Sequence, residues 1–178
     1  LRIEAISVRC DASGAIDVGA LAEVLARTRG RPVIVALTCG TTVKGAHDDV
    51  AGVIDCLDAH GFGADRRYVH LDGALNAMVL PFLGGVPDGI KPTFRHGIDS
   101  ISTSGHKMIG TPMPCGVLIA RRAHVDRVAS ATAHLRSSDT TLMGSRNGHA
   151  VLSIWSRLMG HGACGYRADV RTCLARTA

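Results

Sequence analysis

The sequence is poor in aromatic residues, in clustered positive charge and in long apolar runs. Aromatic side chains make up 3% of the 178 residues, too few for the base-stacking platforms of proteins that bind single-stranded nucleic acid. The net charge of +5 comes from scattered arginines rather than from a basic block, so we expect no nucleic-acid partner. No apolar run approaches the roughly 18–20 residues that span a bilayer, so we expect no membrane segment.

Closely spaced cysteines are also missing. The six cysteines include no C-x-x-C pair, so the sequence offers no cysteine-based redox or metal motif. Cys39, Cys56 and Cys115 lie in apolar or helical runs, where a free cysteine behaves as a small hydrophobic residue. We therefore expect reduced thiols and a cytoplasmic location. The chain starts at Leu1 within a strand-like segment, and we expect a fragment of a longer protein.

Apolar residues make up 46% of the chain, and their spacing alternates between the periods of strands and helices. Residues 33–37 form a continuous β-branched run, which is typical of a strand covered on both faces. Other strands are expected at residues 4–9, 68–71, 98–102 and 116–120. Helices are expected from Asp17 to about Thr28, from Asp48 or Asp49 onward, and at residues 74–82, 123–129, 150–159 and 166–176. This order predicts an α/β fold with a mainly parallel sheet and right-handed crossovers.

Polar side chains gather where the expected strands end. Thr41 and Thr42 follow the first parallel strand, Asp72 ends the second, and residues 104–107 follow the third. In parallel sheets, ligands bind outside the carboxyl ends of the strands. The sequence therefore predicts one site that collects these side chains.

Lys107 is the reactive residue of this predicted site. It is one of only three lysines in the chain, so it is not a routine surface charge. Lysine forms Schiff bases with carbonyl compounds. A buried lysine with a carboxylate, a histidine and small hydroxyls fits pyridoxal 5′-phosphate (PLP), because the carboxylate of Asp72 would hold the pyridine nitrogen protonated. Hydroxyl and backbone N–H groups would hold the phosphate.

Two competing motifs match less well. Residues 40–45 begin like a phosphate-binding loop, but Ala46 and His47 stand where that motif requires Lys and then Ser or Thr. His70 and Asp72 lie on the same side of a strand and could form a metal pair, but no third ligand stands at metal-site spacing. We therefore expect no metal.

Three segments carry a resemblance to a known family: SISTSGHKMIGTPMPCGV, YVHLDGALNAMVLPF and SSDTTLMGSRNGHA. They closely resemble the PLP-dependent amino-acid decarboxylases of group II, within them the histidine decarboxylase branch, which also contains plant serine decarboxylases. The resemblance covers residues 33 to about 155. It implies the three-layer, PLP-dependent transferase-like large domain of fold type I, incomplete here. Residues 1–145 would be the central part of that domain, and residues 146–178 the start of the crossover into a small C-terminal domain.

The resemblance also implies roles for single residues. Lys107 is similar to the Schiff-base lysine, and Asp72, in an H-x-D-x-A pattern, is similar to the partner of the pyridinium nitrogen. His70 resembles the strand histidine near the cofactor ring, and Ala74 the small residue that lets the ring lie flat. Gly73 stands where alanine is common, which we expect to be a minor change.

Four further residues match positions on the phosphate and substituent sides of the cofactor. Ser104 and His106 resemble the phosphate-side contacts. Thr41 and Thr42 match the G-T-T turn near the ring substituents or the substrate carboxylate, although both could instead cap a turn. His134 stands where relatives carry a tyrosine that is assigned to protonating Cα, and histidine can donate a proton near neutral pH.

The implied reaction is decarboxylation of an L-amino acid, first of all histidine to histamine and CO2, with PLP bound as a Schiff base on Lys107. Serine, valine or another small amino acid is the alternative substrate, because the residues that choose the substrate lie mostly outside this chain. A PLP-binding remnant without activity is the alternative from a different class. The family resemblance further implies a homodimer or higher homo-oligomer, with active sites at the subunit interface.

Overall fold

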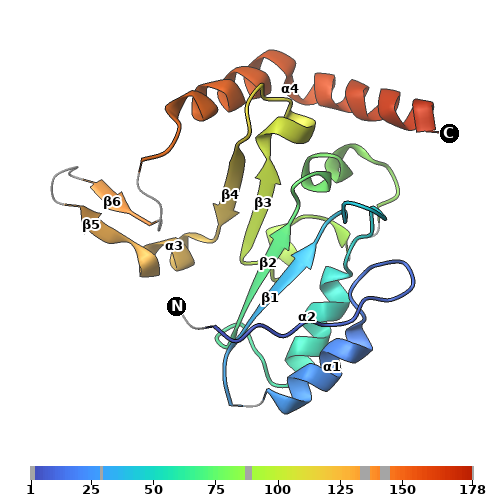
Figure 1. The fold of residues 1–178 in the computed structure, drawn as a ribbon, viewed down its shortest axis with the longest axis vertical. Helices are drawn as coiled ribbons and strands as arrows, with labels where there is room; N and C mark the ends of the chain where they lie inside the picture. The colour runs from blue at the N-terminus through green and yellow to red at the C-terminus, as the bar shows by residue number, and fades with distance from the viewer. Residues whose placement is uncertain (1–2, 29, 87–89, 133–136, 141–144, 178) are drawn as a thin grey trace.

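The computed structural model describes residues 3–28, 30–86, 90–132, 137–140 and 145–177. Its centre is a four-stranded sheet with the strand order β1-β2-β3-β4 (Figure 1). The strands are β1 (Val33–Thr38), β2 (Arg67–Asp72), β3 (Ser100–Ser104) and β4 (Gly116–Ala120). The first three run parallel, and β4 pairs antiparallel with β3. The expected α/β fold with a mainly parallel sheet is thus confirmed.

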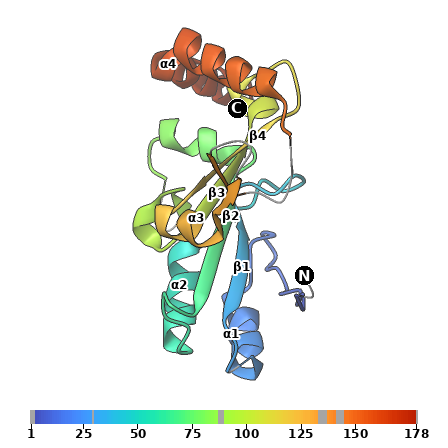
Figure 2. The same ribbon diagram turned by 90° about the vertical axis from the view of Figure 1, so that its left-hand side faces the viewer.

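Two helices, α1 (Val18–Arg27) and α2 (Val50–Ala59), cover one face of the sheet (Figure 2). Their apolar sides meet the same faces of β1 and β2 in a single core. The residues of this core include Leu21, Leu25, Val35, Leu37, Val50, Val53, Leu57, Val69 and Leu71. As expected from the sequence, Asp17 begins α1, and its carboxylate accepts a hydrogen bond of 3.0 Å from the backbone N–H of Ala20.

The opposite face of β1 is open in the described part of the chain. Val35 and Leu37 are buried, whereas Ile34 is 64% exposed. The expectation of a strand covered on both faces is therefore wrong for these residues, because α1 and α2 both lie on one side. The open face matters for function, since side chains of even-numbered residues on β2 and β3 point to it.

Asp48 joins the N-terminal segment to the end of β1. This side chain is buried, and its carboxylate accepts from the backbone N–H groups of Ile16, at 2.6 Å, and Thr38, at 2.7 Å. The neighbouring Asp49 is the N-terminal residue that flanks α2, without a side-chain capping bond. Of the two sequence candidates for the cap of α2, Asp49 thus occupies the capping position. Asp48 instead links the N-terminal segment to β1.

Two expected elements are different in the structure. Residues 4–9 form no strand, because no neighbouring strand pairs with them, and only a single bridge joins Cys10 to Ile16. Residues 74–82 form two short 3₁₀ turns, η1 (Asn76–Met78) and η2 (Leu80–Phe82), rather than one helix. Pro81 has no backbone N–H to donate within a helix, which is consistent with this break.

The C-terminal part of the described chain lies above and beside the sheet (Figure 1). It contains α3 (Arg122–Val128), the strands β5 (Ser130–Thr132) and β6 (Ser137–Asp139), and α4 (Gly148–Thr177). The two helices expected after residue 150 are one element, kinked at Gly162, where φ is 63°. None of the described helices combines the length and the apolar character needed to cross a membrane.

Candidate active site

The predicted residues Asp72 and Lys107 lie at the same edge of the sheet. Asp72 is the last residue of β2, and Lys107 follows the end of the neighbouring strand β3 by three residues. Lys107 belongs to a single π-type turn, η5 (Gly105–Ile109). It is exposed, so the expectation of a buried lysine is wrong for the described chain. The topology therefore brings to one edge of the sheet two residues that lie 35 positions apart in the sequence.

The turn that carries Lys107 is closed by backbone hydrogen bonds at both ends. Gly105 N–H donates to the Cys115 carbonyl at 2.8 Å, and Gly110 N–H donates to the Lys107 carbonyl at 3.0 Å. Gly110 adopts φ of 79°, which favours glycine. At Gly105 a Cβ would overlap the Cys115 sulfur and lie 3.1 Å from Thr111 Oγ1. Glycine at position 105 is thus required by the packing of the turn itself.

Asp72 is held by the chain that follows it. The Ala74 N–H donates to Asp72 Oδ1 at 3.0 Å, while the Gly73 N–H donates to the Ser102 carbonyl at 2.9 Å. The Ala74 carbonyl in turn accepts from the Ser104 N–H at 3.0 Å. A Cβ at Gly73 would overlap the Ala77 side chain. Glycine at position 73 is therefore a packing requirement in this chain, rather than the minor change that the sequence indicated.

His70 lies beside Asp72 on the open face and contacts two serines of β3. Its Nδ1 lies 2.8 Å from Ser100 Oγ, and its Nε2 lies 3.3 Å from Ser102 Oγ. Ser102 Oγ also lies 3.5 Å from Asp72 Oδ1. The sequence shows both serines in a run of small hydroxyl residues before Lys107 but assigns them no role, although the alternation of β3 opposite His70 and Asp72 carries that signal.

The remaining predicted residues lie at or after the ends of β1 and β3. Ser104 ends β3 half-buried, and the His106 ring contacts the backbone of Cys115, with Nδ1 3.3 Å from its nitrogen. Thr41 Oγ1 accepts from the Ala46 N–H at 3.0 Å, as a turn-capping residue does, and Thr42 is exposed. For Thr41 the capping alternative is thus observed, which leaves its role toward a ligand as a prediction.

Helix α4 is fastened to the lysine turn through one carbonyl. The Ile109 carbonyl, two residues after Lys107, accepts from Arg157 Nε at 3.1 Å and from the buried Tyr166 hydroxyl at 3.1 Å. The two donors lie on opposite sides of the kink at Gly162. Burial raises the pKa of the Tyr166 hydroxyl, so it stays a donor at neutral pH. No sequence pattern pointed to these contacts, because they join segments far apart in the chain.

Tyr166→Phe is expected to lower the free energy of unfolding by about 1 kcal/mol, the typical worth of one hydrogen bond. The measurement is urea unfolding followed by circular dichroism. Tyr68→Phe is the matched control, because within the described residues the Tyr68 hydroxyl makes no hydrogen bond. Equal unfolding midpoints for the two variants would show that the contact between Tyr166 and Ile109 contributes nothing.

Cys39 lies at the end of β1 and is buried, as its apolar context indicated. Burial, followed by the nearby charges of Asp72 and Asp48, raises the pKa of this thiol from 9.0 to about 12. The raised value favours folding below pH 9, and that contribution is lost as the pH rises from 9 toward 12. We expect iodoacetamide to label the exposed Cys164 at pH 8 and to leave Cys39 unmodified, as mass spectrometry of peptides would show. Comparable labelling of both would contradict the burial of Cys39.

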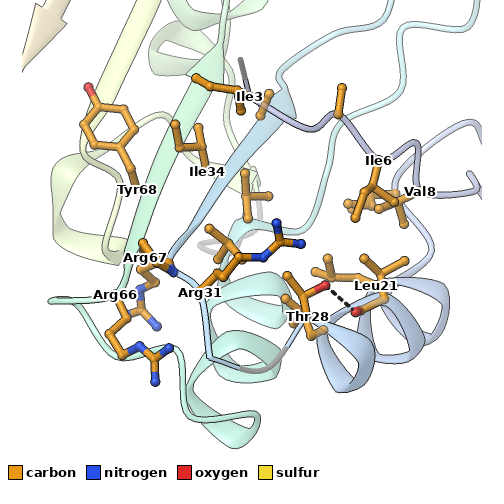
Figure 3. Close-up of a pocket in the computed structure, with 18 of the residues that line it drawn as sticks. Ile3, Ile6, Val8, Leu21, Thr28, Arg31, Ile34, Arg66, Arg67 and Tyr68 are labelled. Carbon is orange, nitrogen blue, oxygen red and sulfur yellow. Dashed lines mark hydrogen bonds between the residues drawn. The ribbon is translucent and has the colours of Figure 1, made fainter. Parts of the chain in front are cut away.

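One hollow of the described structure lies away from the lysine. It is a groove of about 1070 Å³ along β1, between the N-terminal segment, α1 and the starts of β1 and β2. Figure 3 shows Ile3 and Ile6 of the N-terminal segment above Leu21, with Ile34 beside them. Of the predicted site residues, Thr41 alone lines this groove. This groove therefore does not locate the site, which rests on the chemistry of the strand ends.

Two further sequence expectations concern a proton donor and a metal ion. His134, the candidate proton donor, lies outside the described residues. The described residues hold no cluster of three or more His, Cys, Asp or Glu side chains that could bind a metal ion.

The donor set at the strand ends fits PLP. A primary amine for covalent attachment stands on Lys107, a carboxylate for a ring nitrogen stands on Asp72, and the hydroxyl of Ser104 lies between them in the chain. The backbone of Ala74 joins the carboxylate to β3, since its N–H donates to Asp72 and its carbonyl accepts from the Ser104 N–H. The chemistry of these groups matches the amine, carboxylate and hydroxyl requirements of the cofactor.

Comparisons with known proteins agree with this chemistry. Residues 1–178 match the family model described as the pyridoxal-dependent decarboxylase conserved domain. The chain is 43% identical to serine decarboxylase 1 of Oryza sativa subsp. japonica over 173 residues, which is 97% of this chain and 35% of the relative. It is 41% identical to histidine decarboxylase of Morganella morganii over 161 residues, covering 90% of this chain and 42% of the relative.

A solved structure shares the fold as well. L-methionine decarboxylase from Streptomyces sp. 590, in complex with L-methionine methyl ester, superposes with a TM-score of 0.71 at 32% identity, covering 90% of this chain and 40% of that one. The chain thus spans between about a third and two fifths of the length of these three proteins. Since the family model covers every residue, the chain belongs to the pyridoxal-dependent decarboxylase family.

Proposed function

We propose that this protein decarboxylates an L-amino acid with PLP attached to Lys107. The observation that carries the proposal is the placement of Lys107 and Asp72 at adjacent strand ends in a chain that matches the pyridoxal-dependent decarboxylase family throughout. When bound there, PLP supplies an electron-accepting ring that takes up the electron pair left as CO2 departs.

Each of the central site residues has a role in this proposal. Lys107 would hold the cofactor covalently through its side-chain amine. Asp72 holds a proton at the pyridine nitrogen, which keeps the ring an effective electron acceptor. His70 lies beside that carboxylate and supports its orientation. Ala74 leaves room for the flat ring.

Four further residues are assigned to the cofactor phosphate, the ring substituents and the substrate carboxylate. Ser104 and His106 would bind the phosphate, since a hydroxyl and an imidazole can both donate hydrogen bonds to it. Thr41 and Thr42 would contact ring substituents or the substrate carboxylate, because their turn follows β1 at the same edge of the sheet. These assignments extend the resemblance residue by residue.

Histidine is the proposed substrate and serine the runner-up. Support for histidine comes from the match to the Morganella morganii enzyme, and support for serine from the slightly higher identity to the rice enzyme. The test is release of CO2 from a panel of L-amino acids by the protein supplied with PLP. Faster release from histidine supports the first assignment, and faster release from serine the second. Release from no amino acid, with PLP bound, would contradict decarboxylation itself.

The domain division and the oligomeric state are proposed on the same basis. Residues 1–145 would belong to the PLP-binding large domain, and residues 146–178 would lead into a small domain, consistent with the start of α4 at Gly148. A homodimer is favoured by the exposed apolar side chains Val151, Trp155 and Met159 on α4. A monomeric mass in light scattering would contradict the dimer.

A further inference from the structure

Two serine hydroxyls, the His70 ring and Asp72 form one continuous row across β2 and β3. The row runs from Ser100 Oγ to His70 Nδ1 at 2.8 Å, from Nε2 to Ser102 Oγ at 3.3 Å, and from there to Asp72 Oδ1 at 3.5 Å. The parallel register explains it, because His70 lies opposite Ser100 and Asp72 opposite Ser102. The last contact is the longest, and in it Asp72 accepts a hydrogen bond from Ser102.

The chemistry of the end groups sets the direction of the protons. An ionised carboxylate can only accept, so the single proton of Ser102 points to Asp72. The oxygen of Ser102 is then free to accept, and His70 must donate from Nε2–H. A neutral imidazole with Nε2–H has a bare Nδ1, which accepts from the hydroxyl of Ser100. The carboxylate favours this order because a charged acceptor attracts the hydroxyl proton more strongly than a neutral one, although its contact of 3.5 Å is the longest in the row.

We propose that Ser100 and Ser102 are positioning residues that fix His70 as its Nε2–H tautomer and aim a chain of donors at Asp72. The chain stabilises the negative charge of the carboxylate through the imidazole and orients it along the edge of the sheet. Ser100 is 1% exposed, so water does not replace its hydroxyl easily when it is removed. The catalytic meaning of this chain rests on the proposed function, whereas the tautomer does not.

The tautomer is tested first, without cofactor or substrate. Protein labelled with ¹⁵N-histidine is examined by long-range ¹H–¹⁵N correlation NMR, and His70→Gln identifies the signal of His70 among the nine histidines. The expected result is a proton on Nε2 and a bare Nδ1. Ser100→Ala and Ser102→Ala should each abolish the fixed tautomer. A proton on Nδ1 with a bare Nε2 in the unmodified protein would overturn the proposal.

Thr103→Val is the matched control on the same strand. The Thr103 hydroxyl oxygen is buried and has no hydrogen-bond partner among the described residues, so the valine removes a hydroxyl without breaking a contact. We expect the His70 signals of this variant to match those of the unmodified protein. Loss of the tautomer in Thr103→Val as well would mean that any change in β3 disturbs His70, and the specific role of the serines would fall.

The effect on catalysis is measured separately. Ser100→Ala and Ser102→Ala are expected to lower kcat by up to roughly tenfold, as removal of one hydrogen bond does, with little change in KM. Ser100→Thr, which keeps the hydroxyl, should restore kcat. Unchanged kcat in both alanine variants would overturn the positioning role. If the tautomer is found as expected but no amino acid is decarboxylated, the proposed function fails while the hydrogen-bond chain stands.

Discussion

Asp72→Asn is expected to retain PLP while lowering kcat by roughly 10²–10³-fold, the usual cost of removing one electrostatic contact that stabilises a transition state. The asparagine side chain keeps an oxygen that can accept from the Ala74 N–H, so the local fold should survive. It carries no negative charge to hold a proton on the pyridine nitrogen. Cofactor retention is read from visible absorbance after gel filtration, and kcat from CO2 release.

The control for this change is Asp55→Asn. Asp55 is exposed on α2, on the covered side of the sheet, and its replacement alters the net charge by the same amount. We expect its kcat to equal that of the unmodified protein. If Asp72→Asn kept near-full turnover, the assignment of Asp72 to the ring nitrogen would be wrong. Loss of PLP together with activity would instead indicate that Asp72 serves binding.

Lys107→Ala is expected to abolish covalent attachment of PLP and to lower turnover by roughly 10³-fold or more, as removal of a covalent catalyst does. The turn should persist, because its closing hydrogen bonds are made by backbone atoms of Gly105, Gly110 and Cys115. Attachment is measured as cofactor that remains on the denatured protein after borohydride reduction.

Lys91→Ala is the control, since it removes one of the two other lysines from an exposed position 16 residues before Lys107. It should bind PLP covalently and turn over substrate at the unmodified rate. Covalent cofactor on Lys107→Ala in the same amount as on the control would show that another amine attaches PLP, and the site would have to be moved.

Much of this site could be predicted because parallel strands end at one edge. Asp72 and Lys107 each follow an apolar β-rich run, and the sheet order β1-β2-β3 makes their strands neighbours. Val69 and Leu71 of β2 are buried while their neighbours are not, and the two-residue period of a strand predicts this alternation. The family resemblance then added roles to positions that topology had already grouped.

Other features depend on contacts between distant segments and leave no local signal. The Ile109 carbonyl accepts hydrogen bonds from Arg157 and Tyr166 of α4, and no periodicity or motif in the sequence predicts these contacts. The strand expected at residues 4–9 has the right composition but no partner to pair with in the described chain. Gly73 looked like a neutral exchange until the position of Ala77 was known. In each case tertiary packing decided what composition left open.

The most direct test of this account is borohydride reduction of the protein incubated with PLP, followed by peptide mapping. With only Lys44, Lys91 and Lys107 in the chain, the label can be assigned to a single side chain without ambiguity. The account predicts one labelled peptide, containing Lys107. A label on Lys44 or Lys91 in place of Lys107 would contradict the central claim that the turn after β3 holds the cofactor.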